Sequence, residues 1–157
     1  YCGLRATEVC LLKIDDYNIH TASILCTRLK KGNDNTLRII DPRVIAAIND
    51  YLDIRGTHYK KSEYLFISQK GTAMSRKSLD KIMKYHCKRA DIPESKHHFH
   101  VLRHTRAVEL AECGLDTKDI QWWLGHKRIS STIIYMKYTT RQQDSLYDKL
   151  ALALKDE

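Results

Sequence analysis

The sequence predicts a mixed α+β fold, with one mostly helical domain and a small antiparallel sheet of about three strands near the N-terminal end. Three observations predict it. The 157 residues are a usual length for one domain with its own core. Residues 13–41 alternate turn formers with short apolar runs, and after residue 41 apolar side chains recur at helical spacing. We therefore interpret residues 1–157 as a single domain.

The N-terminal part is expected to be a helix followed by β structure. Residues 3–12 are predicted to be helical and place Arg5 and Glu8 three residues apart, on one face. Taken alone, this pair is a surface ion pair that contributes about 0.3 kcal/mol. Residues 23–29 and 36–40 are predicted to be the two strands of a hairpin, joined by a polar loop.

Two helices are predicted in the middle of the chain. The first begins at Asp41-Pro42, because aspartate caps a helix and proline suits its first position, and it is expected to end at Gly56. Ser75 is expected to cap the second, whose predicted inner face comprises Leu79, Ile82, Met83 and His86. The opposite face of that helix is basic and includes Arg76 and Lys77.

The last third of the chain is predicted to be wholly helical. Helices are expected at residues 99–113, ended by Gly114, and at residues 117–124, capped by Asp116 and ended by Gly125. Two more are predicted at residues 131–138 and 141–155, the last with a stripe of leucines. We expect at least one of the adjacent tryptophans, Trp122 and Trp123, to lie in the core.

The composition favours a polyanionic partner. Lysine and arginine outnumber the acidic residues 27 to 19, which gives a net charge of +8 and a pI of about 9.3. Such a surplus suits nucleic acid before membrane, and no run approaches the roughly 18 apolar residues of a membrane span. The five cysteines include no Cys-x-x-Cys pair, which indicates free thiols in a reducing cytoplasm.

Residues 100–135 concentrate the side chains that carry chemistry. His100 and Arg103 are three residues apart and share a helix face, while His126 follows a Leu-Gly pair and Tyr135 lies nine residues later. Cations can stabilise the charge on phosphate oxygens, and a phenol can attack phosphorus. These residue types are what a phosphoryl-transfer site needs if it uses no metal.

The pattern resembles the tyrosine recombinase (phage integrase) family. The matching elements are His100-Val101-Leu102-Arg103-His104-Thr105, Gly114, Leu124-Gly125-His126 and Tyr135, preceded by Gly3-Leu4-Arg5 with Glu8 and by Lys31-Gly32-Asn33. They stand in the family's order and spacing across the whole chain. The resemblance implies a catalytic domain of that family, whose members usually carry a separate N-terminal DNA-clamping domain outside this stretch.

The resemblance also implies a mechanism and a role for each matching residue. Tyr135 would attack a DNA phosphodiester and become joined to the 3′-phosphate, while Lys31 would protonate the leaving 5′-hydroxyl. A second 5′-hydroxyl would then reverse the step without metal, ATP or any cofactor. The remaining roles would be phosphate clamping by Arg5 and Arg103, acid–base chemistry by His100, a phosphate hydrogen bond from His126, and support from Glu8 and His104.

Double-stranded DNA is accordingly the expected partner, and the expected assembly is a tetramer on DNA. The expected location is the cytoplasm, at the nucleoid. Basic side chains expected to contact the DNA backbone are Lys30, Arg76, Lys77, Lys127 and Arg128.

Several alternatives stay open at this point. Lys31 in a polar turn could be merely solvated, with Lys30 beside it, and Tyr138 is a second phenol three residues after Tyr135. The cluster His97, His98, His100 and His104 raises a zinc site. Type IB topoisomerase chemistry uses a similar set of residues, and an inert DNA-binding protein could retain it. The last helix could pack on its own domain or on a neighbouring protomer.

Overall fold

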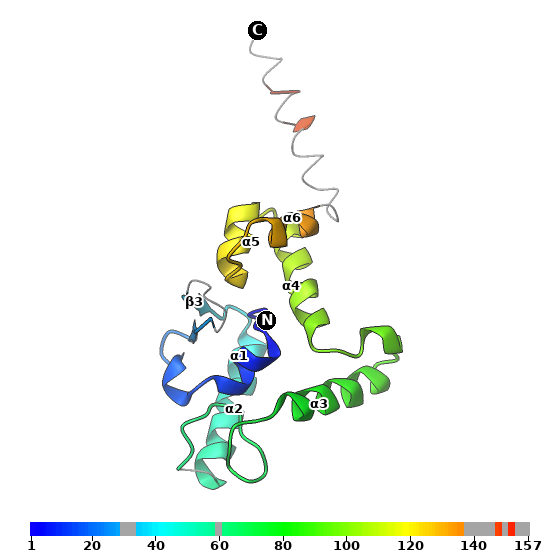
Figure 1. Cartoon of the computed structure of the whole chain (residues 1–157). Coiled ribbons are helices and arrows are strands. Elements are labelled where there is room, and N and C mark those ends of the chain that lie inside the picture. The colour runs from blue at the N-terminus through cyan, green and yellow to red at the C-terminus, as the bar shows by residue number, and fades with distance from the viewer. Residues whose placement is uncertain (29–33, 59–60, 137–146, 149–150, 153–157) are drawn as a thin grey trace.

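A computed structural model describes residues 1–28, 34–58, 61–136, 147–148 and 151–152. Its elements confirm the predicted α+β class (Figure 1). In order they are α1 (Ala6–Leu11), η1 (Ile14–Asp16), β1 (Tyr17–Asn18), β2 (Ser23–Cys26), β3 (Asn35–Arg38), α2 (Pro42–His58), α3 (Arg76–Arg89), η2 (Glu94–Lys96), α4 (His100–Glu112), α5 (Thr117–Leu124) and α6 (Ser130–Met136).

The three strands form an antiparallel sheet, as predicted, and they lie in the order β1-β2-β3. Ile24 pairs with Leu37 and both are buried, whereas Leu25 between the buried positions is 43% exposed. Because side chains alternate along a strand, one face of the sheet enters the core and the other faces solvent. Half-buried apolar side chains of α2 and the buried Leu65 complete this sheet-side core.

A second core lies between α4, α5 and α6. Ala107 and Ala111 of α4 are fully buried, and their small side chains let α5 and α6 approach closely. Ile120, Leu124 and Tyr135 fill the space between the three helices. Trp123 packs against both cores, so the predicted core tryptophan is confirmed, whereas its neighbour Trp122 is 54% exposed. In Figure 1, α4 runs from the α5–α6 pair down toward the end of α3.

Local capping signals fixed several boundaries correctly. Ser75 caps α3 by accepting a hydrogen bond from Ser78 N–H, and Asp116 caps α5 by accepting one from Asp119 N–H. Gly125 ends α5 in the left-handed conformation, with φ of 62°. Helix α4 spans nearly the predicted range, and Gly114 follows its end with φ of 86°.

Other boundaries differ from the prediction. Helix α1 begins at Ala6, so Arg5 is its N-cap residue and not an interior residue. Helix α2 continues through Gly56 to His58, because Gly56 keeps a negative φ and Thr57 Oγ1 donates to Asp53 O, 3.0 Å away. Strand β2 stops at Cys26 and β3 begins at Asn35, since the backbone N–H of Arg28 donates to the Asp34 carboxylate.

The inner face of α3 is also rotated from the predicted one. Cys87 is buried and Leu79 and Met83 are half-buried, so the inner stripe runs at intervals of four residues. Ile82 is 45% exposed and His86 is exposed, so neither belongs to that stripe.

Three predictions concern residues outside the described ranges. They are the hairpin loop with Lys30 and Lys31, the second phenol Tyr138, and most of the helix predicted at residues 141–155. Within the described ranges, no helix is both long enough and apolar enough to cross a membrane.

Candidate active site

Tyr135 lies in α6 with its ring against α4. Its hydroxyl is 2.7 Å from Nδ1 of His104, and the residue is only 4% exposed. Burial raises the pKa of the Tyr135 phenol, although the nearby charge of Arg103 acts in the opposite direction. Burial also lowers the pKa of His104, and the charges of His98 and Arg103 lower it further. The site therefore pairs a protonated phenol with a neutral imidazole.

Arg103 of α4 is buried within the site, at 1% exposure. Nη1 donates to the carbonyl of Gly3 at 2.6 Å, and Nη2 donates to the carbonyl of Leu124 at 2.7 Å. Burial and the charge of Arg5 lower the pKa of Arg103 to about 10, which leaves it cationic at neutral pH. An arginine has five N–H donors, so donors remain beyond these two bonds.

A glycine is required where the N-terminal segment meets α5. Gly3 has φ of 67°, and a Cβ there would lie 2.7 Å from Cδ2 of Leu124. This close approach brings the Gly3 carbonyl within reach of Arg103, two residues before Arg5.

Arg5 and Glu8 form a clasp at the start of α1. The backbone N–H of Arg5 donates to Oε2 of Glu8 at 2.8 Å, and Nη1 of Arg5 donates to Oε1 at 2.7 Å. Burial raises the pKa of Glu8, but the hydrogen bonds from Arg5 and the charge of Arg28 outweigh it and leave that pKa below its ordinary value. Glu8 is therefore an ionised, buried carboxylate that orients Arg5.

His100 occupies the first position of α4. Its ring meets the ring of His104 edge to face, with centroids 4.5 Å apart, and burial followed by the charge of His104 lowers its pKa. His100 and Arg5 line a hollow of about 520 Å³ that extends to Arg76 and His98. The structure thus places two residues of the expected constellation on one concave surface with a residue of α3.

His126 follows directly after the end of α5. Its Nδ1 is 2.9 Å from the hydroxyl of Thr132, which is fully buried, and its ring stacks on Tyr135 with centroids 6.4 Å apart. Burial, with the charges of Arg103, Arg5 and Arg28, lowers the pKa of His126 to about 4. At neutral pH the imidazole is uncharged and has one donor and one acceptor nitrogen.

Reasoning from sequence missed three polar residues of this region. Arg28, Asn35 and Thr132 are all buried, and their hydrogen bonds surround the end of α5 and His126. The two-residue period of a strand could have identified Arg28, because it continues the buried positions Ile24 and Cys26 of β2. Asn35 likewise alternates in phase with Leu37.

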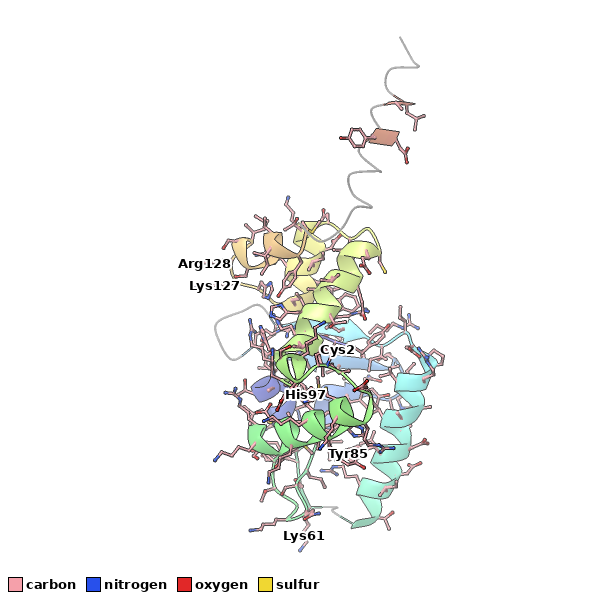
Figure 2. The ribbon with its side chains drawn as sticks, turned by 90° about the vertical axis from the view of Figure 1, so that its right-hand side faces the viewer. Cys2, Lys61, Tyr85, His97, Lys127 and Arg128 are labelled. Carbon is pink, nitrogen blue, oxygen red and sulfur yellow. The ribbon has the colours of Figure 1, made fainter. Side chains whose placement is uncertain are left out.

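The basic residues expected at DNA lie on two parts of the surface. Arg76 and Lys77 open α3 and are exposed. Lys127 and Arg128 occupy the turn between α5 and α6, on the opposite side from α2 in Figure 2. Within the described part of the chain, no three histidine, cysteine or acidic side chains are grouped to hold a metal ion.

The model of the phage integrase family matches residues 1–142. The type 1 fimbriae regulatory protein FimB of Escherichia coli K12 is 33% identical over 148 residues, which are 94% of this chain and 73% of FimB. The tyrosine recombinase XerA of Pyrococcus furiosus is 34% identical over 142 residues, 88% of this chain and 47% of XerA.

Solved structures give the same picture. The crystal structure of XerA recombinase superposes with a TM-score of 0.80 at 30% identity, over 95% of this chain and 54% of that one. XerH bound to palindromic difH substrate in a post-cleavage complex superposes with a TM-score of 0.77 at 24% identity, over 100% and 43% of the two chains. The chain therefore spans about half the length of these recombinases.

Proposed function

Because the chain belongs to the phage integrase family of tyrosine recombinases, we propose that it catalyses site-specific DNA strand cleavage and rejoining through a 3′-phosphotyrosyl intermediate. The observation that carries the proposal is the hydrogen bond between the Tyr135 hydroxyl and His104, beside the buried cation Arg103. A nucleophile within hydrogen-bond reach of a base is the arrangement that covalent catalysis requires.

The first chemical step is a transesterification. Tyr135 Oη attacks the phosphorus of a DNA phosphodiester, an O–P bond forms to the tyrosine, and the bond to the 5′-oxygen breaks. Burial lowers the pKa of His104, and in the neutral tautomer that carries its proton on Nε2 the phenolic proton passes to Nδ1, 2.7 Å away. The leaving oxygen takes a proton from Lys31, a role that rests on the family resemblance.

His104 is the better candidate than His100 for the proton acceptor. The nitrogen that approaches the phenol belongs to His104. The ring of His100 packs against the ring of His104 and not against the phenol. His100 lines the hollow with Arg5, which suits a donor to the phosphate oxygens. The sequence assigned the acid–base role to His100, and the geometry favours moving it to His104.

The charge balance of the site favours a phosphate. Arg5 and Arg28 form ion pairs with a single ionised carboxylate, Glu8, whose charge also acts on the buried cation Arg103. Burying surplus positive charge is costly unless an anion neutralises it. A phosphodiester held by Arg5 and Arg103 supplies that anion, and guanidinium groups match its oxygens bidentately.

His126 completes the proposed phosphate site as a neutral donor. If the Thr132 hydroxyl donates to Nδ1, the proton of the imidazole resides on Nε2 and is available to a phosphate oxygen. The depressed pKa keeps this tautomer uncharged at neutral pH.

Access to the nucleophile requires movement. Tyr135 is 4% exposed, so α6 or its ring must shift before the hydroxyl meets a DNA phosphate. Until that shift occurs the Tyr135 phenol stays protonated and buried, which limits cleavage before the protein has assembled on DNA.

The phosphotyrosyl bond conserves the energy of the phosphodiester, so the proposed reaction uses neither ATP nor a metal ion. A second 5′-hydroxyl attacks the phosphotyrosine, and His104 returns its proton to the tyrosine. Exchange between duplexes needs four active sites, so we propose a tetramer on double-stranded DNA, acting at the nucleoid in the cytoplasm.

The test uses nicked duplexes with randomised bases around the nick, because a nick lets the short fragment that carries the leaving 5′-hydroxyl diffuse away and traps the adduct. We expect a protein–DNA adduct that survives denaturant, and peptide mapping should place the DNA on Tyr135. The sequences that become attached then define a substrate for the variants below. A folded protein that binds the pool and forms no adduct on any member would refute the proposal.

A further inference from the structure

The last carbonyls of α5 each receive a side-chain donor from another part of the chain. A helix leaves its final carbonyls without intrahelical partners. Here Trp122 O accepts from Asn35 Nδ2 at 2.7 Å, Trp123 O accepts from Arg28 Nη2 at 2.9 Å, and Leu124 O accepts from Arg103 Nη2 at 2.7 Å. The donors come from β3, from Arg28 two residues after the end of β2, and from α4. This helix end, which directly precedes His126, is thereby fixed to three elements.

Arg28 also contacts the clasp that holds Arg5. Its Nη1 donates to Oε2 of Glu8 at 3.1 Å, and the other oxygen of that carboxylate accepts from Arg5 at 2.7 Å. Its Nη2 donates in addition to Oδ1 of Asn35 at 2.9 Å. The side chain of Arg28 is 0% exposed, so it lies behind these groups and not on the surface that faces solvent.

The backbone at the turn is shaped to admit this guanidinium. Gly125 has φ of 62°, and a Cβ there would lie 2.4 Å from Nε of Arg28 and 2.9 Å from its Cδ. Any other residue would displace the Arg28 side chain or strain the backbone. The turn into His126 and the position of Arg28 are therefore mutually dependent.

We propose that Arg28 is a positioning residue for strand cleavage, which joins the Arg5–Glu8 clasp to the helix end that presents His126. The inference rests on the proposed function, because it assigns Arg28 to the same reaction. Arg28 fixes the distance between two groups that hold one phosphate, and it contacts no DNA itself. Its loss should lower the rate of cleavage and leave the affinity for DNA unchanged.

A lysine could not replace it. Arginine presents donors on two nitrogens in a planar fork, so it reaches the Glu8 carboxylate on one side and the Trp123 carbonyl on the other. Lysine keeps the charge but has a single nitrogen. The conservative variant therefore separates positioning from electrostatics.

The chain provides a matched control in Arg55. That arginine is 4% exposed, against 5% for Arg28, and it also donates to backbone carbonyls, those of Ser62 and Tyr64. Within the described part of the chain, its hydrogen bonds go to Ser62 and Tyr64 and none goes to the candidate active site. A merely structural effect of losing a buried guanidinium should appear equally in both positions.

The experiment compares Arg28→Lys and Arg28→Met with Arg55→Lys and Arg55→Met in the full chain. The substrate is a nicked duplex that the wild-type protein has been shown to attack, so a failure of the proposed function is recognised before any variant is tested. Three quantities are measured: the melting temperature, the Kd for the duplex, and the rate of adduct formation at saturating DNA.

We expect both Arg28 variants to form the adduct about 100-fold more slowly, the cost of misplacing a catalytic group by about 1 Å, at unchanged Kd. The Arg55 variants should lose melting temperature but keep the rate. Should Arg28→Met be unfolded at the assay temperature, the rate of Arg28→Lys answers the same question. A folded Arg28→Lys with the wild-type rate would overturn the proposal, and so would an equal loss of rate in Arg55→Lys.

A double-mutant cycle tests whether Arg28 affects the rate of cleavage through His126. If Arg28 acts through His126, then Arg28→Met should slow a His126→Ala protein much less than it slows the wild type. Effects that multiply fully in the double variant would contradict positioning.

Discussion

The two ends of the molecule use buried polar side chains very differently. Among the described residues, six polar or charged residues are buried, and five of them gather around the end of α5: Glu8, Arg28, Asn35, Arg103 and Thr132. The sixth, Arg55, stands alone near the end of α2, where it donates to the carbonyls of a loop. Both regions bury a guanidinium against backbone carbonyls.

The difference lies in what the carbonyls belong to. At Arg55 they belong to residues 62–64, which pack beside the sheet-side core and carry no candidate chemistry. At Arg28 and Arg103 they belong to the helix end that leads into His126, and the cations there exceed the single carboxylate. The burial of an arginine alone therefore does not identify an active site. A surplus of positive charge around a side chain that can react does identify one.

The largest expected effect separates two buried tyrosines. Tyr135→Phe removes only the hydroxyl, so we expect DNA binding to persist and adduct formation to disappear. Tyr17→Phe is the matched control, because Tyr17 lies in the sheet-side core at 7% exposure and its hydroxyl donates to Asn49 of α2. Each variant should lose about 1 kcal/mol of stability with its hydrogen bond. The measurement is the adduct on a denaturing gel.

Tyr138→Phe, at the second phenol considered from sequence, should still form the adduct. Adduct formation by Tyr135→Phe, together with its loss in Tyr138→Phe, would show that the other tyrosine is the nucleophile.

The next effect distinguishes the two histidines at the start of α4. His104→Ala should slow adduct formation by about 10²- to 10⁴-fold, the usual contribution of a general base. His100→Ala should slow it less and weaken the interaction with phosphate instead, because its ring does not contact the phenol. Single-turnover rates at saturating DNA decide between them. A larger loss of rate in His100→Ala would assign the role of proton acceptor to His100, as predicted from the sequence.

Arg103→Lys should slow cleavage by roughly 10²- to 10³-fold, the loss typical of one oxyanion donor. The structure adds a stability cost, because the single nitrogen of a lysine cannot reproduce the two-nitrogen fork that donates to Gly3 O and Leu124 O. That cost should be about 1–3 kcal/mol. Arg55→Lys should match the fall in melting temperature and spare the rate. A folded Arg103→Lys that cleaves at the normal rate would remove Arg103 from the phosphate clamp.

Local signals in the sequence predicted the fold better than they predicted contacts. Asp116 and Gly125 bound α5 correctly because capping depends on residues within one turn. Gly56 misled because a glycine only weakens a helix, and one that keeps a negative φ can continue it. Ile82 misled because helical spacing allows two adjacent stripes, and contact with α1 selected the other.

The same distinction holds for the site. The spacing of His100 and Arg103 is visible in sequence because both lie on one helix. The bond from Tyr135 to His104 spans 31 residues, and the bonds from Arg28 and Asn35 to α5 span 95 and 87 residues. Such pairings depend on how the two cores meet at Trp123, which no local pattern encodes.

Between pH 4 and 7, a pH-dependent effect on stability is expected from the histidines of the site. The pKa of His126 falls from 6.5 to about 4 on folding, through burial and the charges of the arginines. The unfolded chain therefore binds more protons between these values, so His126 stabilises the fold fully above pH 6.5 and loses this contribution as the pH falls toward 4. The slope from one half-buried histidine should be less than about 1.4 kcal/mol per pH unit.

Denaturant unfolding at pH 7, 6, 5 and 4 measures that slope. His126→Asn should flatten it only partly, because His100 and His104 also have lowered pKa values. His20→Asn, in the exposed turn between β1 and β2 and outside the site, is the control substitution. An unchanged slope in His126→Asn would contradict the depressed pKa.

The smallest expected effect is on the salt dependence of DNA binding, and it compares basic side chains on two parts of the surface. Binding of a protein with a net charge of +8 should weaken with salt, and each phosphate contact contributes about 0.9 to the slope of log K against log salt. Arg76 lines the hollow that contains Arg5 and His100, so Arg76→Ala should reduce the slope by about one contact. Lys61→Ala removes the same charge at the far end of the molecule, beyond α3 in Figure 2, and should leave it unaltered. Equal changes in both variants would mean that net charge, and not this surface, governs binding.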